Sequence, residues 1–263
     1  MNELDQCLAL LVEHHPEHHL AALFSRPDKR RHATGLLTAI AEIRAIPRDC
    51  RDTNVAVTKL AWWQQECARL AEGEPRHPAT RCLLDHPTLA GAPHWHDLLD
   101  AVARDVRYDA YPGEAELDDL AHRLGQPVTG LFALLDGTAA DAELQRLIAR
   151  ADWLCQLRAH AGAGRLYLPL DHLAAHDLAP ESLHAPTPGE RLGELLHTAT
   201  TTLIEALAAP HQGTPTQRVL GALALAELHH LRRHRWRSWP TPRPGWRRVL
   251  TAWNAARKAA SGP

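Results

Sequence analysis

Apolar residues recur every three or four positions along most of the chain, a spacing that is typical of helices that bury one face. The first clear example carries its apolar face on Leu36, Leu37, Ile40 and Ile43. Asp28 is a residue that can cap the start of this helix. Pro47 is the expected stop, because proline has no backbone N–H with which to continue the helical hydrogen bonds. The pattern therefore predicts a helix between these two residues.

The next apolar stripe predicts a second helix, which residues 52–54 can cap and which Gly73 and Pro75 end. The stripe consists of Leu60, Trp63, Cys67 and Leu70. Trp63 lies on it and is predicted to belong to the core. Trp62 lies beside it, and two interpretations stay open: packing between helices, or a place at the border of a ligand site.

Further helical segments are expected at about 94–109, 114–136, 139–160, 189–209, 215–235 and 244–259. Two of them follow a cap-then-proline start, "TPGE" at 187–190 and "TPTQ" at 214–217. The longest non-helical stretch runs over 161–188, with a short helix expected at 170–175. No strand alternation of useful length and no internal repeat is present, so the sequence predicts a single all-α domain over residues 1–263.

Composition agrees with this fold, because 45% of the 263 residues are apolar and Ala and Leu favour helices. The net charge of −2 is unevenly distributed, since no Asp or Glu follows Leu228. The tail carries Arg232, Arg233, Arg235, Arg237, Arg243, Arg247, Arg248, Arg257 and Lys258. Such an end suggests an anionic partner: phospholipid, nucleic acid or a phosphate-bearing ligand. Nucleic acid is disfavoured, because no recognised binding module is present.

Cysteine usage and the chain start favour a cytoplasmic location. No C-x-x-C spacing occurs, so Cys7, Cys50, Cys67, Cys82 and Cys155 are expected to be reduced thiols. The start "MNELDQ" lacks a basic region, and no apolar run reaches about 18 residues, so neither a signal peptide nor a membrane span is expected. The tail mixes Arg with Trp236, Trp239, Trp246 and Trp253. Two alternatives follow: peripheral contact with the inner face of a membrane, or tryptophans docked on the core.

Three stretches together resemble the squalene/phytoene synthase family. "KLAWWQQECARLAEGEPRHPATRCLL" (59–84) is similar to its tryptophan-pair helix and His-Pro turn, and "GRLYLPLDHLAAHDL" (164–178) to its Gly-Arg-x-Tyr-Leu-Pro segment. "LRRHRWRSWP" (231–240) and "WRRVLTAWNAARKA" (246–259) resemble its C-terminal arm and helix. The resemblance implies an isoprenoid-synthase-type helical bundle around a central cavity.

Active members of that family join two prenyl diphosphates head to head, with Mg²⁺ held by two facing aspartate-rich motifs. The resemblance implies that these acids would stand near Arg44, Arg48, Gln156 and His160, none of which is a carboxylate. Asp152 is the one carboxylate in residues 151–164. We therefore expect a degenerate active site with no catalytic residue, no metal ligand and no cofactor. The pattern looks closer to the branch that includes the mitochondrial complex I assembly factor, which Glu42 and His160 fit.

Several basic and aromatic residues form the expected ligand-binding set. Guanidinium and ammonium groups can hold a phosphate without a metal. The set consists of Arg44, Arg48, Lys59, Trp62, Arg158, His160, Arg165 and Tyr167. The alternative is that the arginines are solvated, and that the segment 164–169 closes the core with Tyr167 bonded locally.

Two other clusters are not expected to be sites. Metal binding is not expected at "EHHPEHH" (13–19), because Pro16 interrupts the helix, nor at "HHLRRH" (229–234). The acids of residues 97–109 alternate with arginines and are expected on a solvated face.

Three functions remain open. The first is a protein that has lost magnesium-dependent prenyl transfer and binds a prenyl phosphate or lipid-like molecule, or serves as an assembly or accessory factor. The second is an active prenyltransferase that uses Mg²⁺. The third is a helical scaffold with a filled cavity.

Overall fold

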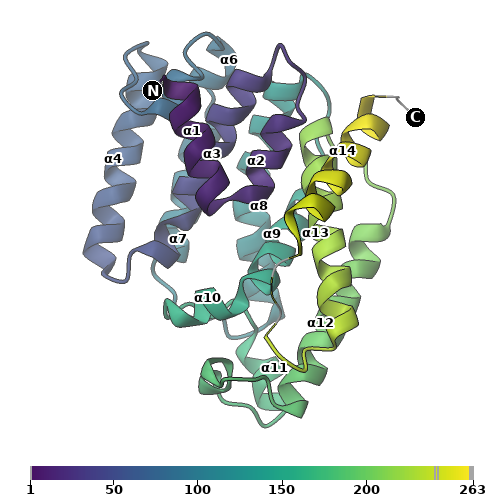
Figure 1. Cartoon of the computed structure of the whole chain (residues 1–263). Coiled ribbons are helices and arrows are strands. Elements are labelled where there is room, and N and C mark those ends of the chain that lie inside the picture. The colour runs from purple at the N-terminus through teal and green to yellow at the C-terminus, as the bar shows by residue number, and fades with distance from the viewer. Residues whose placement is uncertain (1, 240, 242, 261–263) are drawn as a thin grey trace.

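The computed structural model describes residues 2–239, 241 and 243–260, and it builds the chain almost entirely from helices (Figure 1). The long helices are α1 (Glu3–His14), α2 (Pro16–Leu23), α3 (Arg30–Asp49), α4 (Thr53–Ala71), α7 (His94–Asp105), α8 (Glu114–Asp136), α9 (Ala142–Cys155), α12 (Glu190–Ala208), α13 (Pro215–His234) and α14 (Gly245–Ala260). The short ones are α5 (Pro78–Arg81), α6 (Pro87–Ala90), α10 (Leu157–Gly162), α11 (Leu170–Ala175) and the 3-10 turn η1 (Pro180–His184). Among the described residues the pairing of extended backbone is limited to one isolated bridge, between Ala110 and Leu166. The predicted all-α fold is confirmed.

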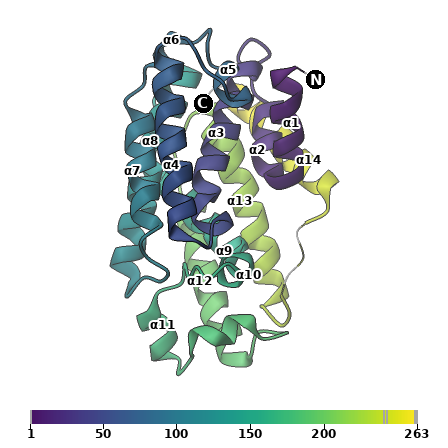
Figure 2. The same ribbon diagram turned by 90° about the vertical axis from the view of Figure 1, so that its left-hand side faces the viewer.

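The long helices run side by side and enclose a common core. α8 packs on α7 and α9, and α13 packs on α9, α12 and α14. α3 fills the middle of the bundle between α2 and α7, and α4 covers its outer side (Figures 1 and 2). α4 and α14 lie on opposite sides of the molecule in Figure 1. Helices from both sides can therefore direct side chains toward one central space.

Several local signals act as the sequence predicts. Asp52 caps α4 by accepting a hydrogen bond of 2.7 Å from the backbone N–H of Asn54. Thr214 and Gln217 form a reciprocal capping box at the start of α13. The predicted spans of α8 and α11 are reproduced residue by residue.

Other helix ends differ from the prediction. α3 begins at Arg30 and continues through Pro47 to Asp49, whereas Asp28 pairs with Arg26 at 3.0 Å. The last turn of α3 persists because Pro47 is buried and its carbonyl accepts a hydrogen bond from Arg165. The local sequence does not reveal this distant contact.

The remaining differences concern three helices. "TPGE" supplies no side-chain cap, since α12 begins after Gly189. The segment expected over 139–160 is divided at Gln156 into α9 and α10. The helix expected over 94–109 ends at Asp105, where the chain turns so that this carboxylate meets Tyr111.

The segment that resembles the family's Gly-Arg-x-Tyr-Leu-Pro motif closes the lower end of the bundle. Gly164 adopts φ +81°, a left-handed conformation that favours glycine and turns the chain out of α10. Leu166 and Leu168 are buried, and the Leu166 N–H donates to the carbonyl of Asp109 at 2.7 Å. Leu166 and Leu168 thus plug the core, as one of the two alternatives has it, but the Tyr167 hydroxyl bonds to Asp105, 62 positions away, and not locally.

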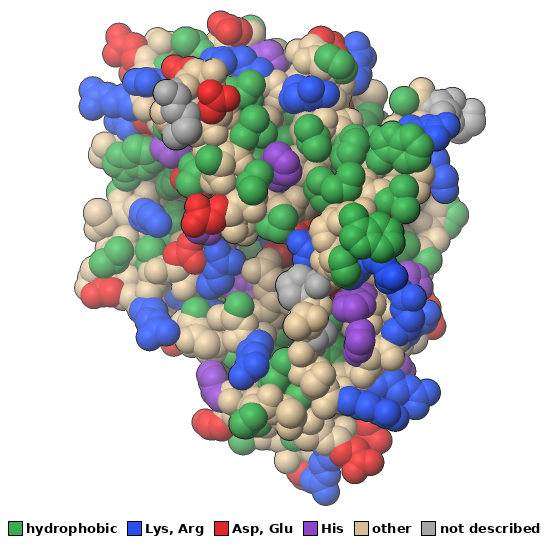
Figure 3. All heavy atoms as spheres, in the orientation of Figure 1, with side chains coloured by type: hydrophobic (Ala, Val, Ile, Leu, Met, Phe, Trp, Pro, Cys, Tyr) green, Lys and Arg blue, Asp and Glu red, His purple; other side chains and the backbone are tan. Residues whose placement is uncertain are grey.

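The surface of the C-terminal helix differs from the rest. Figure 3 shows hydrophobic side chains gathered over α14, with Lys and Arg side chains beside them. Trp236 is buried and Trp239 half-buried, whereas Trp246 and Trp253 are exposed. The alternative of tryptophans docked on the core thus holds for Trp236, and membrane contact through the exposed Trp246 and Trp253 stays a prediction. Within the described residues, none of the helices combines the length and apolar character required to cross a membrane.

Candidate functional site

A cavity of about 350 Å³ lies between the helices on either side of the bundle. Most of its wall is apolar, with Ile40, Val102, Leu124, Val128, Phe132, Ile148, Leu220, Leu223 and Leu231. Its polar part is formed by His15, Glu17, His18, Arg44, Arg48, Asp105, Asp152, Gln156, His160, Tyr167, Glu227 and Arg248. A pocket of this kind suits an amphipathic molecule with one hydrocarbon part and one charged part.

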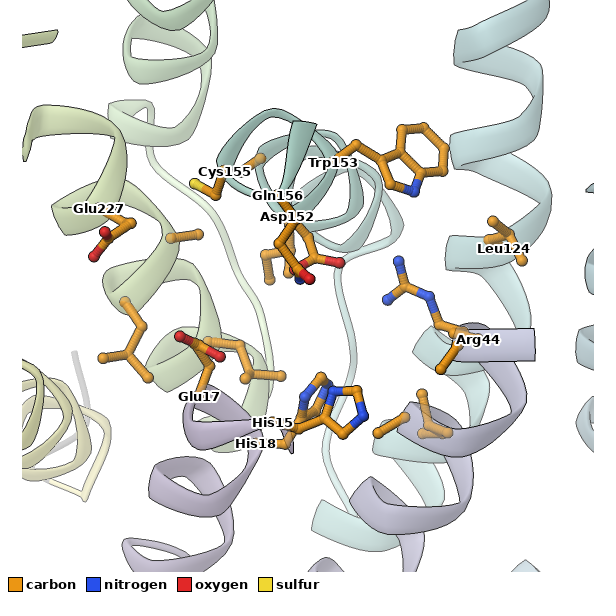
Figure 4. Close-up of a pocket in the computed structure, with 18 of the residues that line it drawn as sticks. His15, Glu17, His18, Arg44, Leu124, Asp152, Trp153, Cys155, Gln156 and Glu227 are labelled. Atoms are coloured by element: carbon orange, nitrogen blue, oxygen red, sulfur yellow. The ribbon is translucent and has the colours of Figure 1, made fainter. Parts of the chain in front are cut away.

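Two arginines one turn apart on α3 place positive charge in this cavity. Figure 4 shows the Arg44 side chain extending into the space toward Asp152 and Gln156. Arg44 is half-buried and makes no hydrogen bond or ion pair with any residue that the structure describes. Arg48 is already engaged, because its Nε pairs with Asp49 Oδ1 at 2.8 Å and its Nη1 donates to Gln156 Oε1 at 3.0 Å. Arg44 is therefore a cation whose whole guanidinium is left to bind a partner, and a partly desolvated cation favours an anionic partner.

Four histidines line the same cavity, His14, His15, His18 and His160. Pro16 separates α1 from α2, and the turn brings the His15 and His18 rings to 5.7 Å edge to face. His160 packs edge to face on Tyr167 at 4.8 Å, and neither of its buried ring nitrogens has a hydrogen-bond partner. Burial lowers the pKa of His15, of His18 and of His160. These three rings are therefore neutral at about pH 7, and an anion beside them would favour their protonation.

Asp105 anchors an aromatic wall of the cavity. Its two oxygens each accept a hydrogen bond of 2.7 Å, from the hydroxyls of Tyr111 and Tyr167. Tyr167 stacks on Trp153 with ring centroids 4.7 Å apart. Burial raises the pKa of Asp105, although the two tyrosine hydroxyls oppose that rise. The expectation that Asp105 lies on a solvated face was wrong, because it continues the buried face of α7 that carries Leu98 and Val102.

The other carboxylates of the cavity come from separate helices and already have partners. Glu17 pairs with Arg248 at 3.3 Å, and Glu227 Oε1 accepts the backbone N–H of Arg243 at 3.3 Å. Asp152 Oδ1 accepts from the side-chain amide of Gln156 at 2.5 Å. In the part of the chain that the structure describes, no three His, Cys, Asp or Glu side chains form a cluster suited to a metal ion.

The predicted ligand-binding residues divide into two groups. Arg44, Arg48, His160 and Tyr167 line the cavity together. The other four, Lys59, Trp62, Arg158 and Arg165, lie outside it. The expected pocket of five cations is therefore corrected to Arg44 and Arg48, which the prediction named, and Arg248, which it did not.

Each of the four outlying residues has a physical reason for its place. Lys59 and Trp62 lie on the outer face of α4, where Trp62 is 40% exposed. Arg158 is exposed, with its guanidinium 5.5 Å from the Trp239 ring centre. Arg165 is buried, and it donates to the carbonyl oxygens of Pro47, Asp105, Val106 and Tyr108.

Sequence reasoning missed the contribution of α2 and α13. His15 and His18 were considered only as metal ligands, and Glu17 and Glu227 were not considered (Figure 4). The signal was present in Pro16, because a proline between two helices turns the chain and exposes the side chains beside the turn to a common space.

Comparison with known proteins agrees with this geometry. Residues 11–254 match the family model described as squalene/phytoene synthase. A crystal structure of a dehydrosqualene synthase in complex with ligand has a TM-score of 0.69 and 16% identity, over 99% of this chain and 97% of that chain. Squalene synthase HpnC from Alicyclobacillus acidocaldarius has a TM-score of 0.66 and 18% identity, over 90% of this chain and 95% of that chain. Comparison with curated proteins gives no significant sequence match. The isoprenoid-synthase-type fold is thereby confirmed.

Proposed function

The chain belongs to the squalene/phytoene synthase family, and from that premise we propose that its cavity binds a prenyl phosphate or a lipid-like molecule with the same anionic head. The protein holds this ligand without magnesium-dependent transfer of the prenyl group. It then acts as an accessory or assembly factor that binds an isoprenoid-type molecule.

The unpaired Arg44 is the observation on which this proposal depends. A guanidinium that is half-buried and has no protein partner needs an anion or water to complete its hydrogen bonds. Apolar side chains from α3, α8, α9 and α13 form the rest of the wall. A phosphate near Arg44 with its hydrocarbon chain along that wall satisfies both parts of the cavity.

The donor set supports a loss of the metal-dependent step. A magnesium ion requires oxygen ligands in near-octahedral geometry, supplied by carboxylates together with phosphate oxygens and water. Arg44 and Arg48 stand where the resemblance implies the first acid pair. The carboxylate of Asp152 is committed to Gln156, which stands at one of the second pair's positions. Arginine can neutralise a phosphate directly through hydrogen bonds, but it cannot coordinate the diphosphate oxygens as a Lewis acid, which is what a metal ion does.

The second candidate is an active prenyltransferase, and a specific observation favours it. Glu17, Asp152 and Glu227 all face the cavity, from three different helices. A dehydrosqualene synthase and the squalene synthase HpnC share the fold. Carboxylates that change partners when a diphosphate enters would restore a magnesium site.

One set of measurements separates the two candidates. Titration calorimetry with farnesyl monophosphate, without divalent cations, is expected to show binding, and farnesol, which lacks the phosphate, is expected to bind more weakly. Incubation with farnesyl or geranylgeranyl diphosphate and Mg²⁺ is expected to give no presqualene-type or phytoene-type product. Metal-dependent turnover would establish the second candidate, and equal affinity for farnesol and its phosphate would remove the anion site.

A further inference from the structure

The C-terminal helix α14 presents an apolar stripe to the outside of the protein. Trp246, Val249, Leu250 and Trp253 follow the spacing of one helical face and are 65%, 43%, 48% and 43% exposed. Isolated exposed apolar residues are common on protein surfaces, but four on one face of one helix form a patch that calls for a partner. Figure 3 shows a hydrophobic region over α14.

The opposite face of the same helix attaches it to the protein. Ala252 is fully buried, and Arg248 pairs with Glu17 of α2 at 3.3 Å while it lines the cavity. α14 also packs along α13. The apolar stripe is therefore held outward by a docked helix, and it is not the face that stabilises the fold.

Positive charge lies beside the stripe. The Arg247 guanidinium lies 5.1 Å from the centre of the Trp246 ring, and that of Arg257 lies 4.7 Å from the Trp253 ring. No Asp or Glu occurs after Leu228 in the sequence. The exposed cations of this end are Arg233, Arg235, Arg237, Arg247, Arg257 and Lys258. A partner for this surface must therefore combine an apolar layer with negative charge.

We propose that α14 lies in the interface of an anionic lipid bilayer, with Trp246, Val249, Leu250 and Trp253 among the acyl chains and the cations on the lipid phosphates. Helices with Trp and Leu on one face and Arg or Lys around it bind in the plane of such interfaces. A second copy of the chain is the competing occupant. Two such stripes in contact would bring the cations of both copies together, and like charges in an interface oppose association.

The position of α14 connects this surface to the cavity. Trp246 and Arg248 are two residues apart and point to opposite faces of the helix, one outward and one into the cavity. A protein bound through α14 thus holds its cavity next to the bilayer, where a hydrocarbon ligand is concentrated. The docking surface itself does not depend on which ligand the cavity holds.

Co-sedimentation of the full chain with vesicles tests the surface. Wild-type protein is expected to bind vesicles of phosphatidylcholine mixed with phosphatidylglycerol, and to bind them more weakly in high salt. It is expected to bind only weakly to vesicles made of phosphatidylcholine without an anionic lipid. Trp246→Ser combined with Trp253→Ser is expected to reduce binding about tenfold or more, because most of the inserted apolar area is removed. Trp62→Ser is the matched control, since Trp62 is 40% exposed on α4, across the molecule from α14. It is expected to bind like wild type.

Two further measurements make the outcome decisive. Circular dichroism of the double variant and its calorimetric titration with farnesyl monophosphate in detergent are expected to match wild type, which separates this surface from the cavity's function. Vesicle binding that is equal in wild type and double variant would overturn the proposal. Sedimentation velocity that shows a wild-type dimer, a monomeric double variant and no vesicle binding would overturn it in favour of a second copy.

Discussion

The hydroxyl of Tyr167 donates a hydrogen bond of 2.7 Å to the carboxylate of Asp105, which lies 62 positions earlier in the chain. Both side chains are more than nine-tenths buried. This bond joins the family's Gly-Arg-x-Tyr-Leu-Pro segment to the end of α7 and fixes the aromatic wall of the cavity. The same carboxylate receives the hydroxyl of Tyr111, so the two tyrosines share one buried acceptor.

Removal of one donor should weaken this connection measurably. Tyr167→Phe keeps the stacking on Trp153 and deletes the hydroxyl, and we expect it to lower the free energy of unfolding by about 1–2 kcal/mol, because a buried carboxylate oxygen loses its donor. Urea denaturation checks this value. Tyr108→Phe is the control, since Tyr108 is 49% exposed, and it should cost much less. An equal cost in both variants would show that the buried bond contributes little.

The anion site should depend on α3. Arg44→Gln is expected to reduce the affinity for farnesyl monophosphate about 10- to 100-fold, because a charge-assisted hydrogen bond to phosphate is lost while a neutral polar side chain remains. Lys59→Gln, on the exposed face of α4, removes the same charge from the protein and should leave affinity unchanged. Calorimetric titration of both variants measures the difference. Equal losses in the two would point to a long-range charge effect in place of a site.

The buried histidines should make both stability and binding depend on pH. The pKa values of His18 and His160 are lowered by burial in the folded protein, whereas the unfolded chain has the ordinary value of 6.5. Between those values the unfolded state binds more protons, so stability contributed by neutral histidine is present above pH 6.5 and is lost as the pH falls below it. Urea denaturation at several pH values should show this fall. His18→Gln with His160→Gln should reduce the slope, whereas an unchanged slope would assign it to other groups.

Ligand binding should also change the protonation of these histidines. Folding releases their protons, whereas binding of an anion should take protons up. A phosphate beside Arg44, His18 and His160 favours the protonated imidazoles, so binding should take up protons from solution. Calorimetry of farnesyl monophosphate in two buffers with different ionisation enthalpies measures that uptake. The His18→Gln, His160→Gln variant is expected to take up fewer protons than wild type, which separates the imidazoles from the titration of the phosphate itself.

The sequence predicts local features well and distant ones poorly, for physical reasons. The cap at Asp52 and the capping box at Thr214 involve residues two or three positions apart, so the local sequence is enough to predict them. Arg44 could be placed in the cavity because the helical period and the family resemblance agree about α3. Arg165 could not be placed, because the acceptors of its hydrogen bonds lie 57 to 118 positions away.

Asp105 shows a different kind of failure. The arginines beside it suggested a solvated helix face, and the alternation of charge is a reliable guide where a helix has one partner. Asp105 nevertheless continues the stripe of Leu98 and Val102, and α7 packs on both α4 and α8, so this stripe is buried through position 105. The donors that make burial of this acid tolerable, Tyr111 and Tyr167, lie outside the helix.

Arg165 should prove to be a structural residue, although it belongs to the family's most specific motif. Its guanidinium donates to Pro47 O at 3.0 Å and to Tyr108 O at 2.8 Å, and it joins the last turn of α3 to the end of α7. A cation at the C-terminal end of two helices also opposes the partial negative charge of their carbonyls.

We expect Arg165→Met to lower the free energy of unfolding by about 2–4 kcal/mol, because several buried carbonyls lose their donor at once. Arg165→Lys should recover only part of this, since an ammonium cannot reproduce the planar fork that reaches carbonyls from both helices. For the fraction of Arg165→Lys that stays folded, calorimetric affinity for farnesyl monophosphate should equal that of wild type. A loss of affinity as large as that of Arg44→Gln, with stability preserved, would instead place Arg165 in the binding site.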